Sequence, residues 1–349
     1  MLISGGKPPT MAIPKGVQFE QLPPMYSADS SFTRLLDAAG NKIDDAWRED
    51  RKQRLLELFS GFSPHVLITE TFPFGRRMLR FELLPLLQAA NDSETCLLVI
   101  ASIRDILQPK SKAGRNREIC DLVEAHYDHV LVHGDESLAR LVDSFADAAR
   151  IEDKLYYSGY ICSRDESPPG TGDGSGEVLV SAGGSDTGYR ILQTAIDAKP
   201  ESVLRDLPWR LLVSHAFPEE SFAALKDRAG PGIRIERNRA DFRVLLRRAR
   251  LSISQAGYNT VTDILDSETP AIVIPFAEAG EIEQSLRAQK LQRLGRVVTL
   301  AQDDLDANSL AAAIAMTDSA PANSMINLDG ARNSALMVSR WLDTAEAGA

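Results

Sequence analysis

Three turns in the second half of the chain carry residues suited to holding an anionic ligand. The first, in VLVSAGGSDTGYRILQTAI, joins an apolar run to a helical pattern through Gly183, Gly184 and Ser185. Glycines let a ligand approach the backbone closely, and the free N–H groups at a helix start suit a phosphate. The plainer interpretation is a helix cap, and Asp186 would repel a phosphate if it pointed inward. Both interpretations stay open.

The second turn lies in LSISQAGYNTVTDIL, where Ser254 ends a strand and Ala256 and Gly257 leave space beside the backbone. These small residues serve either a tight turn or contact with an anion. Asp263 follows about one helical turn after the helix start. Its carboxylate could accept hydrogen bonds from two ribose hydroxyls, or it could stabilise the positive end of the helix dipole.

The third turn follows AIVIPF, and it places Glu283 and Gln284 near the start of the next helix. In addition, His215 in VSHAFP follows another strand of this half, where it either contacts phosphate or fills an ordinary turn. The carboxyl ends of parallel strands lie along one edge of a sheet. We therefore expect these turns to converge on one crevice.

Short apolar runs alternate with helical patterns along the whole chain, and these elements would position the turns. The expected strands cover residues 65–70, 95–102 and 129–134 in the first half, and 177–184, 210–216, 232–237, 251–254, 271–276 and 296–300 in the second. Near-continuous apolar strands between helices indicate parallel sheets covered on both faces. We therefore predict an α/β fold with two doubly wound, Rossmann-like domains.

One segment separates the two halves. Residues 163–176, SRDESPPGTGDGSG, contain proline, glycine, serine and acids but no apolar residue, which is typical of a flexible linker. This predicts a first domain over 1–162 and a second over 177–330. Residues 331–349 have Leu336, Val338, Trp341 and Leu342 at helical spacing and are predicted to form a helix.

The composition is that of an ordinary globular protein, with 44% hydrophobic and 25% charged residues in 349. No run approaches the length of a membrane span and the start does not resemble a signal peptide, so we expect a cytoplasmic protein. The net charge of −10 argues against a nucleic-acid partner. The three cysteines are far apart in the sequence and make no metal-site pattern, and we expect no metal or other cofactor.

Taken together, the three turns resemble a known family. SAGGSDTG, SISQAGYNTVTDIL with TPAIVIPF, and EIEQSLRAQKLQRLG make residues 177–300 similar to the donor domain of the family 28 glycosyltransferases. That family has the GT-B fold, and its best-known member is the lipid-linked N-acetylglucosaminyltransferase of peptidoglycan synthesis. The resemblance implies that the C-terminal helix returns to the first domain, across a cleft from the second.

The resemblance also implies donor-binding roles for the residues of the turns. Gly183, Gly184 and Ser185 would lie at the donor diphosphate, and Ser254, Ala256 and Gly257 would line the donor pocket. Asp263 stands where the family has a ribose-binding glutamate. Glu283 and Gln284 would contact the donor sugar or ribose, from a loop one residue longer than usual.

The first half is similar to the acceptor domain of a bacterial subgroup of predicted glycosyltransferases. The similarity lies in TETFPFGRR, ASIRDIL, VLVHGD and YYSGYI. In that subgroup a strand and a glycine-rich loop with a histidine come first, whereas MLISGG resembles the second strand. We therefore expect a first domain without this opening unit, either because the sequence is truncated at its N-terminus or because its start is misassigned.

An inverting transfer needs a base to take the proton of the acceptor hydroxyl. Glu70, Asp105 and His133 each follow a first-half strand and are the candidates. Their structural alternatives are an ion pair with the neighbouring arginines, a helix N-cap and a hydrogen-bonded turn residue, respectively.

The predicted function is transfer of a sugar from a nucleoside diphosphate sugar, with UDP expected, to a glycan or lipid-linked acceptor without a metal. A nucleotide-sugar hydrolase and a non-catalytic nucleotide-sugar-binding protein are the alternatives. Two basic clusters, Arg76, Arg77 and Arg80, and Arg239, Arg243 and Arg247, are either solvated faces or contacts with an anionic membrane surface. The second interpretation would place the protein at the periphery of the inner membrane.

Overall fold

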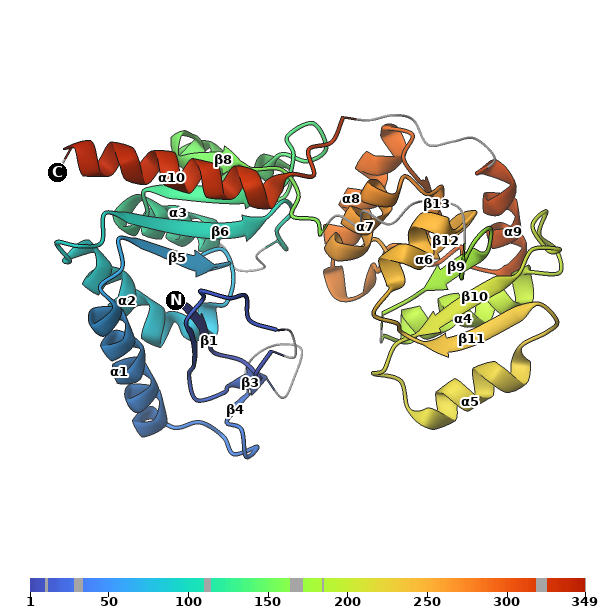
Figure 1. Cartoon of the computed structure of the whole chain (residues 1–349), viewed down its shortest axis with the longest axis horizontal. Coiled ribbons are helices and arrows are strands. Elements are labelled where there is room, and N and C mark those ends of the chain that lie inside the picture. The colour runs from blue at the N-terminus through green and yellow to red at the C-terminus, as the bar shows by residue number, and fades with distance from the viewer. Residues whose placement is uncertain are drawn as a thin grey trace.

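The computed structural model describes residues 1–9, 12–27, 34–109, 114–163, 172–183, 185–317 and 325–348. The chain forms two α/β domains side by side, and the carboxyl ends of the first domain's strands point toward the second domain (Figure 1).

The second domain is built on a six-stranded parallel sheet with the order β11-β10-β9-β12-β13-β14. Its strands are β9 (Val178–Ser181), β10 (Trp209–Val213), β11 (Ile233–Arg237), β12 (Leu251–Ser254), β13 (Ala271–Val273) and β14 (Val298–Thr299). The helices are α4 (Asp186–Ala198), α5 (Glu219–Arg228), α6 (Phe242–Arg248), α7 (Tyr258–Ser267), α8 (Glu283–Arg293) and α9 (Ala307–Met316), with a short 3₁₀ turn η4 (Glu278–Gly280).

Helices cover both faces of this sheet, which explains why its strands are apolar along their whole length. Val178 and Val180 of β9 pack into one core with α4, α5 and α9. Leu179, between them, packs into a second core with α6, α7 and α8. The alternation follows from the period of two in a strand.

The first domain has a four-stranded parallel sheet in sequential order. Its strands are β5 (Val66–Glu70), β6 (Leu98–Arg104), β7 (His129–His133) and β8 (Leu155–Tyr157). Helices α1 (Asp45–Phe62), α2 (Arg80–Asn91) and α3 (Arg115–His126) and the 3₁₀ segments η1 (Arg77–Leu79), η2 (Leu141–Asp143) and η3 (Ala146–Lys154) accompany them.

The N-terminal strands form small sheets of their own. β1 (Leu2–Ser4) and β2 (Phe19–Gln21) pair in parallel, and β3 (Tyr26–Ser27) pairs with β4 (Leu35–Leu36) antiparallel. Met1 and Ile3 pack against the first-domain core. The strand predicted from MLISGG is therefore present, but among the described residues it pairs with β2 and not with the four-stranded sheet.

The C-terminal helix α10 (Gly330–Gly348) lies along the first domain (Figure 1). The Trp341 ring stacks on His129 of β7 at 4.0 Å between centroids and meets Tyr156 of β8 at 4.9 Å. The chain thus crosses to the second domain and returns. No helix within the described ranges is long and apolar enough to cross a membrane.

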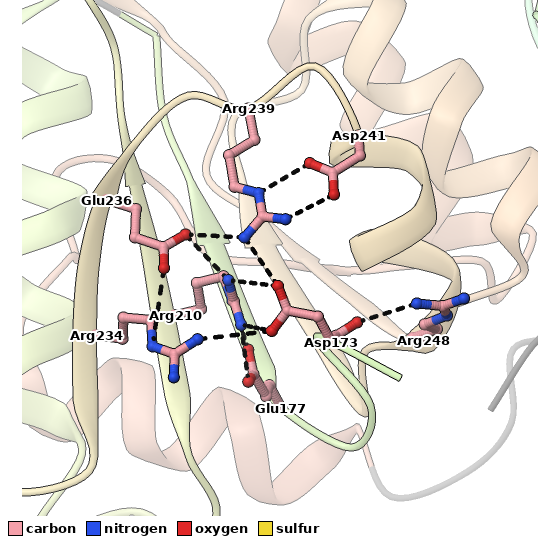
Figure 2. A network of polar contacts seen from close by, with 8 residues as sticks. All are labelled: Asp173, Glu177, Arg210, Arg234, Glu236, Arg239, Asp241 and Arg248. Carbon is pink, nitrogen blue, oxygen red and sulfur yellow. Dashed lines mark hydrogen bonds and ion pairs between the residues drawn. The ribbon is translucent and has the colours of Figure 1, made fainter. Parts of the chain in front are cut away.

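The linker prediction needs a correction at its C-terminal end. Residues 164–171 lie outside the described residues, but Asp173 is held by an ion-pair network on the second domain (Figure 2). The fully buried Arg210 of β10 donates to the carboxylates of Asp173, Glu177 and Glu236. Arg239 also donates to Asp173, at 2.8 Å. Because these partners come later in the sequence, composition alone could not reveal that residues 172–176 belong to this domain.

Candidate functional site

The sheet of the second domain has a topological switch point between β9 and β12. From β9 the chain continues to β10 and β11 on one side, and from β12 it continues to β13 and β14 on the other. Ser181 and Ser254 are register partners, so the two strands end level with each other. Open parallel sheets bind their ligands at such a crevice.

The turn after β9 reaches across this crevice. The Gly183 N–H donates to the Gln255 side-chain oxygen at 2.9 Å, which joins the β9 and β12 turns. Gly184 lies outside the described residues. Ser185 caps α4, since its hydroxyl accepts from the Gly188 N–H at 3.2 Å. Sequence reasoning missed Gly188, where a Cβ would overlap the carbonyl oxygen of Gly183.

The two small residues of the β12 turn have different reasons for being small. Ala256 is fully buried in the core, where a larger side chain has no room. Gly257 has φ −64°, which any residue adopts, and a Cβ there would meet no atom of the described residues within 4 Å. Neither backbone conformation nor packing explains Gly257. Open space therefore lies beside the start of α7, which has no side-chain cap among the described residues.

Gln284 braces two of the turns. Its side-chain oxygen accepts from the N–H of Ala256 and from the N–H of Phe276, both at 3.1 Å. A further bond, from the Thr187 hydroxyl to Glu278 at 2.8 Å, joins the first turn of α4 to the loop after β13. The turns after β9, β12 and β13 are thus fastened to one another. Nothing in the sequence apart from its position in this loop indicated that Glu278 would make this contact.

Asp263 pairs with a neighbouring helix. Its carboxylate accepts from Arg243 of α6 at 2.9 Å, and burial raises its pKa. The ribose-binding role suggested for Asp263 stays a prediction, and the alternative of pairing only with the helix dipole does not include its partner Arg243. Sequence spacing fixed its distance along α7 but not the neighbouring helix that supplies its partner.

The same kind of contact favours the solvated face, the first of the two interpretations of the second basic cluster. Arg239 pairs with Asp241 at 2.6 Å, Arg243 with Asp263, and Arg247 with Asp266 at 2.8 Å. Each guanidinium of the cluster already has a carboxylate, so the face is a row of ion pairs rather than a cationic stripe.

Two other predicted donor residues lie at the carboxyl ends of β12 and β10. Ser254 is fully buried, and its hydroxyl has no hydrogen-bond partner among the described residues. It lies beneath the turn and not on its surface. His215 is exposed after β10, with its Nε2 3.2 Å from the carbonyl oxygen of Asn238.

The three candidate bases of the first domain lie in different environments. The Glu70 side chain is 71% exposed at the end of β5 and pairs with Arg76 at 3.1 Å. His133 has both ring nitrogens engaged, with Ser102 at 2.7 Å and Ser158 at 3.1 Å, and burial lowers its pKa to about 4.

Asp105, the third candidate, is fully buried between the domains. It accepts from Arg287 at 2.8 and 3.3 Å and from the Tyr160 hydroxyl at 2.7 Å. The helix N-cap alternative is also not what the structure shows. These contacts make Asp105 an anchor between domains, shielded from an acceptor in the cleft.

Glu283 and the β12 turn belong to the same interdomain cluster. Arg287 of α8 pairs with Glu283 at 2.9 Å and donates to the Ala256 carbonyl at 3.1 Å. The Tyr258 hydroxyl donates to the carbonyl oxygen of His133 at 3.0 Å. The carboxyl ends of β6 and β7 therefore face the turns of the second domain directly.

Known proteins resemble this chain in sequence. Residues 178–335 match the glycosyltransferase family 28 C-terminal domain. A UDP-N-acetylglucosamine–N-acetylmuramyl-(pentapeptide) pyrophosphoryl-undecaprenol N-acetylglucosamine transferase of Paramagnetospirillum magneticum is 30% identical over 187 residues, 50% of each chain. An uncharacterized glycosyltransferase of Methanopyrus kandleri is 25% identical over 214 residues, 58% of each chain. The chain therefore spans only about half the length of the curated relatives that it matches.

Solved structures resemble it in fold. The glycotransferase of kitacinnamycin has a TM-score of 0.55 at 16% identity, over 94% of this chain and 83% of that one. The MurG protein of Acinetobacter baumannii has a TM-score of 0.53 at 11% identity, over 95% and 85%. Residues 178–335 are thus similar to the glycosyltransferase family 28 C-terminal domain, and the whole chain has the two-domain GT-B fold.

Proposed function

We propose that this protein transfers a sugar, with inversion, from a UDP-linked or other nucleoside diphosphate sugar to a glycan or lipid-linked acceptor. The observation that carries the proposal is the unfilled space at Gly257, beside the start of α7 and at the switch point of the sheet. The family match and the name of the Paramagnetospirillum relative support the same reaction.

The diphosphate would lie against the α7 start and the β9 turn. Helix N-termini and backbone N–H groups stabilise anions, including a diphosphate leaving group, without a metal or other cofactor. The Gly183 N–H is held by the Gln255 side chain, which a diphosphate oxygen would replace. Gln255 therefore acts as a stand-in acceptor that keeps the N–H satisfied until the donor arrives.

The sugar would lie nearer to the loop after β13. Gln284 uses its carbonyl oxygen to brace the turns, which leaves its amide nitrogen to donate to a hydroxyl of the donor. Glu283 is held by Arg287 and would accept from the donor sugar with its other oxygen. His215 would contact the donor from the β10 side of the crevice.

Glu70 is the base in this proposal. Its carboxylate is exposed at the same sheet edge as Asp105 and His133, which both contact the second domain. An accessible carboxylate can take the proton of an acceptor hydroxyl as the glycosidic bond forms. A lipid-linked acceptor would in addition bring the protein to a membrane surface.

Gly257→Val tests the donor site. The new side chain would fill the open space, so we expect UDP binding in calorimetry to weaken at least about tenfold, while the fold stays intact. Gly230→Val is the matched control, because a Cβ there also meets nothing within 4 Å of the described residues in the same domain. Equal UDP affinity in both variants would mean that UDP does not bind in the space beside Gly257.

Turnover separates the proposed reaction from its alternatives. Nucleotide release that depends on an acceptor and is lost in Glu70→Gln is the expected result. Release of free sugar without acceptor would mean hydrolysis, and UDP binding without any turnover would mean a binding protein.

A further inference from the structure

A pocket of the first domain lies outside the proposed donor site. It has a volume of about 120 Å³ and is lined by Arg76, Arg77, Arg80, Arg115 and Glu118 over an apolar floor. We refer to it as the arginine pocket. Its lining residues come from two stretches, one that runs from the loop after β5 through η1 to the start of α2, and one formed by the first turns of α3. Both follow the carboxyl ends of strands, at the edge of the sheet where Glu70 stands.

The charges of the arginine pocket do not balance. Arg77, Arg80 and Arg115 all approach one carboxylate, that of Glu118, with Arg77 at 3.8 Å and Arg115 at 4.0 Å. Arg76 pairs with Glu70. The four arginines face only these two acids, so about two positive charges remain within the described lining. A dianion would balance them, whereas a single carboxylate would not.

The loop that carries Arg76 and leads to Arg77 of η1 and Arg80 of α2 is held in place. Thr71 and Arg76 have φ of 67° and 50°, a region that residues other than glycine adopt at a cost. Phe72 and Phe74 on the same loop are buried in the domain core. Core packing thus fixes the loop. An anion can therefore bind between the guanidinium groups without the cost of ordering the backbone.

We propose that the arginine pocket binds a phosphate or diphosphate group of the acceptor. The guanidinium fork matches phosphate oxygens and stays charged at all relevant pH values. The pocket lies on the acceptor-side domain, beside the proposed base Glu70. No contact among the described residues explains why three arginines share the one carboxylate of Glu118. The acceptor assignment rests on the proposed transfer reaction, but the binding of phosphate by the pocket does not.

Calorimetry of the full chain with sodium pyrophosphate tests the proposal, in the presence of saturating UDP to fill the donor site. We expect Arg80→Gln and Arg115→Gln each to weaken pyrophosphate binding about fivefold, the effect of one partly exposed charged contact. Glu118→Gln should strengthen it by a similar factor, because the competing carboxylate is removed. Acetate should not displace pyrophosphate.

Arg150→Gln is the matched control. The Arg150 side chain is 38% exposed, as is that of Arg80, and it also pairs with acids, Asp121 and Glu124, but outside the pocket. Its pyrophosphate affinity should stay at the wild-type value. The opposite signs expected for Arg80→Gln and Glu118→Gln exclude misfolding as the cause, since misfolding would weaken both.

Two outcomes would overturn the proposal. One is equal pyrophosphate affinity in the wild type, Arg80→Gln and Glu118→Gln. The other is that the arginine variants lose sedimentation with phosphatidylglycerol vesicles but keep pyrophosphate binding, which would make the cluster a membrane contact. If pyrophosphate binds through these arginines but UDP does not bind at all, the transfer reaction fails and the anion site stands.

Discussion

Asp105→Ala is the substitution for which the structure gives the clearest magnitude. It removes the carboxylate that Arg287 reaches across the domain interface, where both side chains are fully buried. Removing one partner of a buried ion pair costs about 3–5 kcal/mol, because the other charge stays buried without compensation. Arg287 keeps Glu283 and the Ala256 carbonyl, so we expect the lower end, about 3 kcal/mol.

Calorimetric unfolding measures this cost. A two-domain protein need not unfold in one step, so the transition to follow is the one in which the domains separate. For a domain of this size about 3 kcal/mol corresponds to a lower Tm by about 6–12 °C. Replacing both residues, as Asp105→Leu with Arg287→Met, should restore only part of the stability, since it removes the uncompensated charge but leaves the Tyr160 hydroxyl and the Ala256 carbonyl without these partners.

Asp197→Ala is the control for burial. Its partner Arg228 lies 2.6 Å away, but the two side chains are 42% and 47% exposed. Exposed pairs contribute at most about 1 kcal/mol. If Asp105→Ala lowers the Tm no more than Asp197→Ala does, the pair does not anchor the domains and the reasoning fails.

Three further predictions concern stability. Gly188→Ala should cost about 1–3 kcal/mol in urea unfolding, because its Cβ overlaps the Gly183 carbonyl, whereas Gly257→Ala should leave stability unchanged. His133 has a folded-state pKa of about 4, below its ordinary 6.5, so the stability due to its neutral ring is complete above pH 6.5 and lost as pH falls toward 4. His133→Gln should remove this pH dependence, and equal pH profiles of the two proteins would contradict it. Trp341→Ala should cost about 1–3 kcal/mol and speed amide exchange in α10, because the ring stacks on His129; unchanged exchange would mean that other contacts hold the helix.

The sequence predicted the strands of the second domain well because burial on both faces makes them continuous apolar runs. Val178–Ser181 and Leu251–Ser254 needed no tertiary information to be found. The small residues of the β12 turn were also visible, but only the structure separates Ala256, which is core, from Gly257, which borders open space.

Side chains whose partners are distant in the sequence could not be placed. Asp105 follows a strand as predicted, yet its burial depends on Arg287, which comes 182 residues later. The spacing of Asp263 along α7 did not reveal its partner, and only the structure shows that this partner is Arg243 of α6. Periodicity gives the position of a residue along its element, while the neighbouring element determines what the side chain meets.

Arg287 also links the two halves of the molecule thermodynamically. One guanidinium binds Asp105 of the first domain and the Ala256 carbonyl of the β12 turn at the same time. Moving the domains apart would break the first contact and loosen the support of the turn. A ligand that orders the turn would therefore raise the free energy needed to separate the domains. Because such coupling is reciprocal, keeping the domains together would strengthen ligand binding at the turn by the same free energy. Ligand affinity at the switch point and the angle between the domains would then both depend on the equilibrium between joined and separated domains.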